Sequence, residues 1–223
     1  MNRAFLRIRH AARDERGFTL VELAIASSLM MTVLAVFASS LISVQRAAIG
    51  QDRRSQNNDQ ARLAVEALDR EIRSANYIYD PANTSYGAPG VPAGFALRIY
   101  TQTNAPTRSP APGYLCVLWQ ITADGKLQTR NWPPLQPSLA TAWRTIATGI
   151  VNRSLSPTVR AFEMDTDTSK GWDTTTGRTV NMVIMANDYL SSLPNATVRI
   201  ELAVTGRNTS YGFPSNVCSA TPA

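Results

Sequence analysis

One carboxylate lies in an otherwise uncharged apolar stretch of this 223-residue chain. The stretch runs from Phe18 to Gln45, contains neither proline nor glycine, and has Glu22 as its single charged residue. A carboxylate at the centre of a membrane span costs roughly 2.5 to 3.5 kcal/mol, so something must compensate Glu22. Either it lies close enough to the interface to reach water or take up a proton, or a cation pairs with it.

Few other residues of the chain suit catalysis. The one histidine, His10, lies in a basic N-terminal segment, and the two cysteines, Cys116 and Cys218, are far apart with no CxxC spacing. Histidine-dependent triads need a group that titrates near neutral pH, and zinc sites need clustered thiolates or imidazoles. We therefore expect no enzyme, no cofactor and no zinc site. The cysteines are interpreted either as a disulfide of an exported protein or as two buried free thiols.

An acidic loop has a spacing that resembles a calcium site, because oxygen-bearing side chains alternate along DTDTSKGWD. Lys170 stands where a calcium loop has glycine, and Thr176 stands where it has a bidentate glutamate. We therefore interpret the segment as a plain polar loop without a metal. The alternating residues are Asp165, Asp167, Ser169 and Asp173.

The apolar stretch itself predicts a membrane anchor. About 20 apolar residues cross a bilayer as a helix, and this run exceeds that length and ends in a polar segment, unlike a cleaved signal peptide. Five arginines and only two acidic residues precede Gly17, which favours a cytoplasmic start. Arginines on the far side, at Arg46, Arg53 and Arg54, weaken the orientation argument when it is taken alone.

The segment RGFTLVEL, residues 16–23, resembles the processing site of type IV prepilins and type II secretion pseudopilins. The resemblance implies that prepilin peptidase cuts between Gly17 and Phe18, and that Phe18 is then N-methylated. It also implies that the Glu22 carboxylate pairs with the N-terminal amine of a neighbouring subunit during assembly. The alternative is an unrelated single-span anchor.

This resemblance implies a minor pilin or pseudopilin that assembles into, or initiates, a type IV pilus or a type II secretion pseudopilus. Its partners would be other pilin or pseudopilin subunits, the inner-membrane assembly machinery, and membrane lipid before assembly. The implied location is the cytoplasmic (inner) membrane with an exported C-terminal head, and then the filament. A weaker similarity, in LAVEALDREIRSA and the strands that follow, is to W-class minor pilins and the J-type minor pseudopilin.

A second function class is a binding module at a filament tip, for DNA uptake or surface adhesion. Trp132, Trp172 and exposed arginines would stack on single-stranded DNA in that case, although tryptophans more often pack in a core. No motif in the sequence supports nucleic-acid binding. A salt-dependent DNA shift by the head would favour this class.

The chain is predicted to have four parts, namely a leader (1–17), a membrane and assembly helix (18–45), an amphipathic continuation (46–79) and a strand-rich exported head (80–223). Apolar residues recur at helical spacing in the continuation, opposite charged positions. This stripe should pack on a sheet, although a surface-lying amphipathic helix or a coiled coil has the same pattern. The stripe comprises Ala61, Val65, Leu68, Ile72 and Ala75.

Alternating apolar residues predict half-buried antiparallel strands in the head, with runs around Trp119, Met182 and Ile200. FALRIY near Phe95 and TVRAFEM near Phe162 are weaker strand candidates. The ADGK segment predicts a hairpin turn after the Trp119 run. The predicted fold class is α+β, with a long N-terminal helix packed on a mostly antiparallel sheet.

Overall fold

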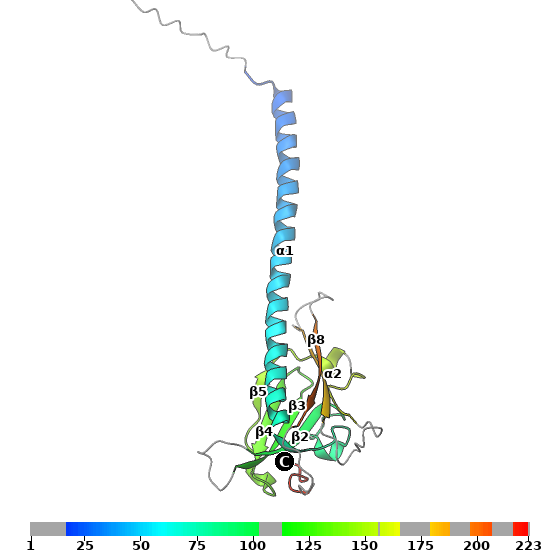
Figure 1. Ribbon diagram of the computed structural model, residues 1–223. Helices are drawn as coiled ribbons and strands as arrows, with labels where there is room; N and C mark the ends of the chain where they lie inside the picture. Colours follow the sequence, from blue (N-terminus) through cyan, green and yellow to red (C-terminus); the bar gives the residue numbers. More distant parts are fainter. Residues whose placement is uncertain are drawn as a thin grey trace, which may run out of the picture. The chain divides into compact units, whose positions relative to one another are not determined.

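The computed structural model describes residues 17–102, 113–155, 157–165, 179–187, 197–206 and 216–222. The chain divides into two compact units, Met1–Ala48 and Ile49–Ala223. Helix α1 (Leu20–Arg73) supplies the described helix of the first unit and the first element of the second (Figure 1). All of the described strands belong to the second unit.

The described residues of the second unit form two antiparallel sheets. The first is a five-stranded meander in which neighbours in sequence are neighbours in space, and the second has three strands in the order β6-β7-β8. A long N-terminal helix followed by antiparallel sheets confirms the predicted α+β fold class. The strands are β1 (Ala75–Ile78), β2 (Ala96–Gln102), β3 (Tyr114–Ile121), β4 (Leu127–Trp132), β5 (Arg144–Ala147), β6 (Phe162–Met164), β7 (Thr179–Ala186) and β8 (Val198–Thr205). Short helices are η1 (Thr84–Tyr86), η2 (Pro137–Leu139) and α2 (Asn152–Leu155).

The last turns of α1 are flanked by strands of both sheets (Figure 1). Their buried side chains, Ala61, Ala64, Leu68 and Ile72, join one apolar core with residues from the two sheets. Small alanines bring the helix close to the strands, while the charged face remains exposed, as at Arg70. The predicted packing of the stripe on a sheet is confirmed, with Ala64 rather than Val65 fully buried.

The helix ends at Arg73, six residues before the predicted end of the amphipathic continuation. The Ser74 hydroxyl donates to the Glu71 carbonyl (2.8 Å), which satisfies one of the last free carbonyls of the helix. The next residues, ANYI, form β1 and pair with β2, so Ala75 is buried as a strand residue. Aromatic and β-branched residues favour a strand here, and pairing with an existing edge outweighs one more helical turn.

Strand β3 is buried on both faces, whereas its alternation predicted one buried face. Val117 and Trp119 face the core with α1, while Cys116 and Leu118 belong to a second apolar cluster on the opposite face. The C-terminal residues 216–222 cover part of that face. Because a segment distant in sequence provides the cover, the pattern of β3 alone predicts exposure there.

A buried arginine holds this C-terminal segment. The Arg98 guanidinium donates to the carbonyls of Cys218 and Ser219, both at 2.8 Å, and to the Thr221 hydroxyl at 2.7 Å. Burial lowers the pKa of Arg98 to about 10. The Tyr79 hydroxyl accepts from the Cys218 amide at 2.9 Å, and burial raises the pKa of Tyr79 to about 12. These bonds fix the tail against the five-stranded sheet.

The predicted ADGK hairpin connects β3 and β4. Ile121 pairs with Leu127, and the Thr122 amide donates to the Lys126 carbonyl at 2.9 Å. Gly125 has φ of 76°, a left-handed conformation that glycine adopts without steric cost. The turn residues therefore set the register of the hairpin, as the sequence indicates.

Candidate functional site

The first turn of α1 is closed by a reciprocal pair of hydrogen-bonding residues, Thr19 and Glu22. The Glu22 amide donates to the Thr19 hydroxyl at 3.2 Å, while the Glu22 carboxylate accepts from the Thr19 hydroxyl at 3.3 Å and from its amide at 3.5 Å. This is the capping-box arrangement, in which a threonine and a glutamate three residues later satisfy free amides at a helix start. Glu22 therefore has a partner within its own chain.

Thr19 is a helix-capping residue that was not predicted from the sequence. Its signal is the T-x-x-E spacing directly before an apolar run, which is typical of a helix N-terminus. From the sequence, Glu22 was interpreted as lying near the interface or as pairing with a cation, and a role in its own helix was not predicted. The cap and the expected cation pair are thus separate roles of the Glu22 carboxylate.

Residues 17–19, which directly precede the helix, are exposed. Phe18 is 85% exposed, and an added Cβ at Gly17 would meet no atom within 4 Å. Gly17 also does not have the positive φ at which other residues are strained. The fold of the described residues therefore places no steric requirement for glycine at position 17.

Among the described residues of the first unit, nothing covers the apolar helix. Its large side chains from Leu20 to Val44 are all exposed, and the helix is long and apolar enough to cross a membrane. Three hydroxyls within it donate to the helix's own carbonyls, which lowers the cost of placing them in lipid. These bonds join Ser27 to Ala24 (3.0 Å), Thr32 to Leu29 (2.7 Å) and Ser39 to Val36 (2.8 Å).

The other candidate residues lie elsewhere. Cys116 and Cys218 form a disulfide with Cα atoms 5.6 Å apart, between β3 and the C-terminal segment. Of the calcium-like loop only Asp165 lies within the described residues, and those residues contain no group of three or more His, Cys, Asp and Glu side chains placed to hold a metal. His10 is also outside the described part of the chain.

The two tryptophans considered for DNA stacking have different outcomes. Trp132 is 1% exposed and packs in the second apolar cluster, so it is not available to stack on a base. Trp172 lies outside the described residues. Trp132 therefore has the core role that is the commoner one for tryptophan.

Comparison with known proteins identifies the segment around this helix start. Residues 12–38 match the family described as "Prokaryotic N-terminal methylation motif", which is about an eighth of the chain. No curated protein and no solved structure shows a significant match to the chain. The matched segment contains Gly17, Phe18, Thr19 and Glu22, so the geometry above belongs to an N-terminal signal of the type IV pilin and pseudopilin kind. The motif and the apolar helix together fit a membrane-anchored protein with an exported head.

Proposed function

We propose that this chain is a minor pilin or pseudopilin, cut after Gly17, methylated at Phe18 and assembled through its N-terminal helix. The observation that carries the proposal is an apolar helix that begins with a methylation motif and whose large side chains from Leu20 to Val44 are all exposed. Such a surface requires lipid or other helices around it. Lipid surrounds the helix of a pilin-like subunit before assembly, and other helices surround it in the filament core, so the requirement is met in both states.

Glu22 has two successive partners in this proposal. In the single chain its carboxylate accepts from Thr19, and both hydrogen bonds are long for their type. After processing, the new amine of Phe18 on one subunit pairs with Glu22 of the next, and this charge-assisted contact is stronger than the bonds that it replaces. An intramolecular cap thus keeps the carboxylate partnered until assembly.

The location follows from the same scheme. The leader stays in the cytoplasm, the helix lies in the inner membrane before assembly, and the head is exported. Prepilin peptidase, other pilin or pseudopilin subunits and the inner-membrane assembly machinery are the proposed partners. The proposal covers both a type IV pilus and a type II secretion pseudopilus, and the W-class or J-type subtype stays a prediction.

Processing is tested by producing the full chain with and without a prepilin peptidase and comparing its size on a gel. We expect a peptidase-dependent loss of the leader, and no loss for Gly17→Leu, whose side chain would obstruct the cut. The fold of the Gly17→Leu variant should be the same as that of the unchanged chain, since an added Cβ at position 17 meets no described atom within 4 Å. Equal processing of Gly17→Leu, or no processing of the unchanged chain, would contradict the proposal.

A further inference from the structure

Three arginines follow the apolar run closely, at Arg46, Arg53 and Arg54. Beside membrane spans the excess of arginine and lysine lies on the cytoplasmic side, so arginines on the exported side need a physical reason. Neither cleavage after Gly17 nor pairing of Glu22 uses them. The structure places one of the three, Arg54, in the wall of a cup within the second unit.

This cup has a volume of about 440 Å³ and lies between α1 and the start of β8, a strand that is beside the helix in Figure 1. The helix contributes Arg54 and the strand contributes Arg199, and both side chains are exposed. None of the described residues that line the cup is acidic. Its other polar lining residues each have a hydroxyl or an amide, and they are Gln51, Ser55, Asn58 and Thr197.

The strand side of the cup retains hydrogen-bond donors for a ligand. The Arg199 guanidinium pairs with Glu201 through its Nε, which leaves its two terminal nitrogens for another acceptor. The Thr197 hydroxyl accepts from the Asn187 side-chain amide at 3.1 Å, so its own proton is available to an acceptor in the cup. The cup therefore offers guanidinium and hydroxyl donors on one side and the Arg54 guanidinium on the other.

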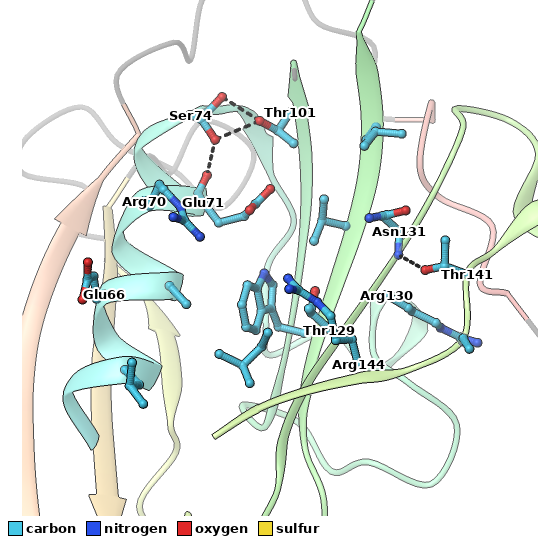
Figure 2. Close-up of a pocket in the computed structure, with 17 residues that line it drawn as sticks. Glu66, Arg70, Glu71, Ser74, Thr101, Thr129, Arg130, Asn131, Thr141 and Arg144 are labelled. Atoms are coloured by element: carbon cyan, nitrogen blue, oxygen red, sulfur yellow. Dashed lines mark hydrogen bonds between the residues drawn. The ribbon is translucent and has the colours of Figure 1, made fainter. Parts of the chain in front are cut away.

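Two arginines with amide and hydroxyl donors suit a phosphate group. A guanidinium donates two parallel hydrogen bonds to phosphate oxygens, and neutral donors satisfy the remaining lone pairs. The larger groove of the second unit, between the end of α1 and the five-stranded sheet, is lined by side chains of both signs and does not select an anion in this way (Figure 2). The charged residues of that groove are Glu66, Glu71, Arg70, Arg130 and Arg144.

The position of the cup along the chain indicates the source of the phosphate. Arg54 is nine residues after Gln45, which is about 14 Å of helix. Side chains on a helix lean toward its N-terminus, and arginine extends its charge to the headgroup level of a membrane. The headgroup layer is about 5 to 8 Å thick on each side of the hydrocarbon core, so an anchored chain holds the cup close to lipid phosphates.

A nucleic acid fits the cup less well than a lipid does. Its backbone presents a row of phosphates, and proteins that bind it make roughly 6 to 10 phosphate contacts. The cup has two arginines, which is the number that a single phosphate requires.

We propose that this cup binds the phosphate of an anionic phospholipid on the exported side of the membrane, with Arg54 and Arg199 as the residues that hold it. This contact keeps the head at the membrane surface before assembly. The proposal rests on the membrane anchoring within the proposed function, and it is independent of cleavage and methylation.

The test uses the full-length, uncleaved chain in nonionic detergent micelles that also contain phosphatidylglycerol or phosphatidylcholine, at physiological ionic strength. An antibody against the head captures the chain, and mass spectrometry counts the lipid retained per chain after washing. We expect more phosphatidylglycerol than phosphatidylcholine to be retained. Arg54→Gln and Arg199→Gln should each lower phosphatidylglycerol retention about fivefold, the loss expected for one basic residue at an anionic lipid surface.

Two further variants sharpen the test. Glu201→Gln should raise retention, because it removes the carboxylate that competes for Arg199. Arg62→Gln is the matched control, since it removes the same charge from an exposed position on the same helix, outside the cup. Arg62 is about 12 Å of helix beyond Arg54, which exceeds the Debye length of about 8 Å, so its loss should leave retention unchanged. Thermal midpoints should be the same in all variants, because the four side chains are exposed.

Equal retention of the two lipids, or an equal loss in Arg54→Gln and Arg62→Gln, would overturn the proposal. Greater release by inorganic phosphate than by chloride of the same ionic strength would also overturn it, because the ligand would then be soluble phosphate. A DNA shift by the full chain that Arg54→Gln abolishes, with lipid retention unchanged, would assign the cup to nucleic acid instead. Failure of leader cleavage would contradict the proposed function but would leave this measurement unaffected, since the chain is tested uncleaved.

Discussion

Replacing Glu22 by glutamine separates the two roles that the structure and the proposal give to this residue. A capping box accepts either glutamate or glutamine three residues after the cap, so Glu22→Gln retains the bonds with Thr19. The same change removes the negative charge that would pair with an amine. Glu22→Ala removes both, and Thr19→Ala weakens only the cap.

The magnitudes favour the charge. The bonds from Thr19 to the Glu22 carboxylate are 3.3 and 3.5 Å long, so the cap contributes at the low end of the about 0.5 to 2 kcal/mol measured for helix caps. Two unit charges 4 Å apart at an effective dielectric constant of about 20 attract by about 4 kcal/mol, of which desolvation leaves about 1.5 to 3 kcal/mol. Loss of the pair should therefore reduce assembly roughly 10- to 150-fold.

The assay compares the amount of chain in sheared filaments with the amount left in the membrane, using an antibody against the head. We expect Glu22→Gln and Glu22→Ala to be deficient in the filament fraction to within about threefold of each other, since the alanine variant loses only the small cap energy in addition, with normal amounts in the membrane. Thr19→Ala should incorporate within about threefold of the unchanged chain, a ratio that corresponds to a small cap energy. If Glu22→Gln assembles normally while Glu22→Ala does not, the carboxylate serves as a helix cap and the charge-pairing proposal is wrong.

Three further predictions concern the head, and unfolding of the full chain in detergent measures each of them. Gly94→Ala should destabilise the head by about 1 to 3 kcal/mol, because φ is +81° and the new Cβ would lie 2.7 Å from the Arg160 side chain. Gly90→Ala has a similar φ of +73° but no atom within 4 Å, so its smaller cost separates backbone strain from crowding. Changing Cys116 and Cys218 to alanine should lower the free energy of unfolding by up to about 4 to 5 kcal/mol, because the disulfide closes a loop of 102 residues. Unchanged stability, or unchanged mobility on a non-reducing gel, would contradict the bond. Glu71→Gln should remove a pH dependence of stability, because burial raises the folded-state pKa of Glu71 above its ordinary value of 4.5. The free energy of unfolding of the unchanged chain, relative to that of the variant, should rise as pH falls toward 4.5 and decline as pH rises. A difference that does not vary with pH would show that Glu71 is solvated.

The sequence predicted those parts of the fold that depend on local patterns. The apolar run before Gln45, the stripe at Leu68 and Ile72, and the ADGK turn each depend on neighbours within a few residues, and each has the predicted structure. Strand β5 was missed, because RTIA is short and contains no clear alternation. Its place is set by pairing with β4 rather than by its own composition.

Features built from distant segments could not be predicted from sequence. Nothing near Arg98 in the sequence indicates its burial, because the C-terminal segment more than a hundred positions later supplies its acceptors. The cup likewise requires α1 and β8 to meet, and nothing near Arg54 in the sequence indicates a second arginine on a distant strand. The helix start is the reverse case, since Gly17 to Glu22 is a contiguous motif whose recognition needs no tertiary contact.

The central claim is that the chain functions as a processed subunit that begins at Phe18. Mass spectrometry of the N-terminal peptide, from chain purified out of native membranes and filaments, measures this directly. The account predicts a peptide that starts at Phe18 and carries one additional methyl group on its amine. A peptide that still contains Gly17 and the residues before it, in both fractions, would contradict the account and leave a membrane-anchored head without a role in assembly.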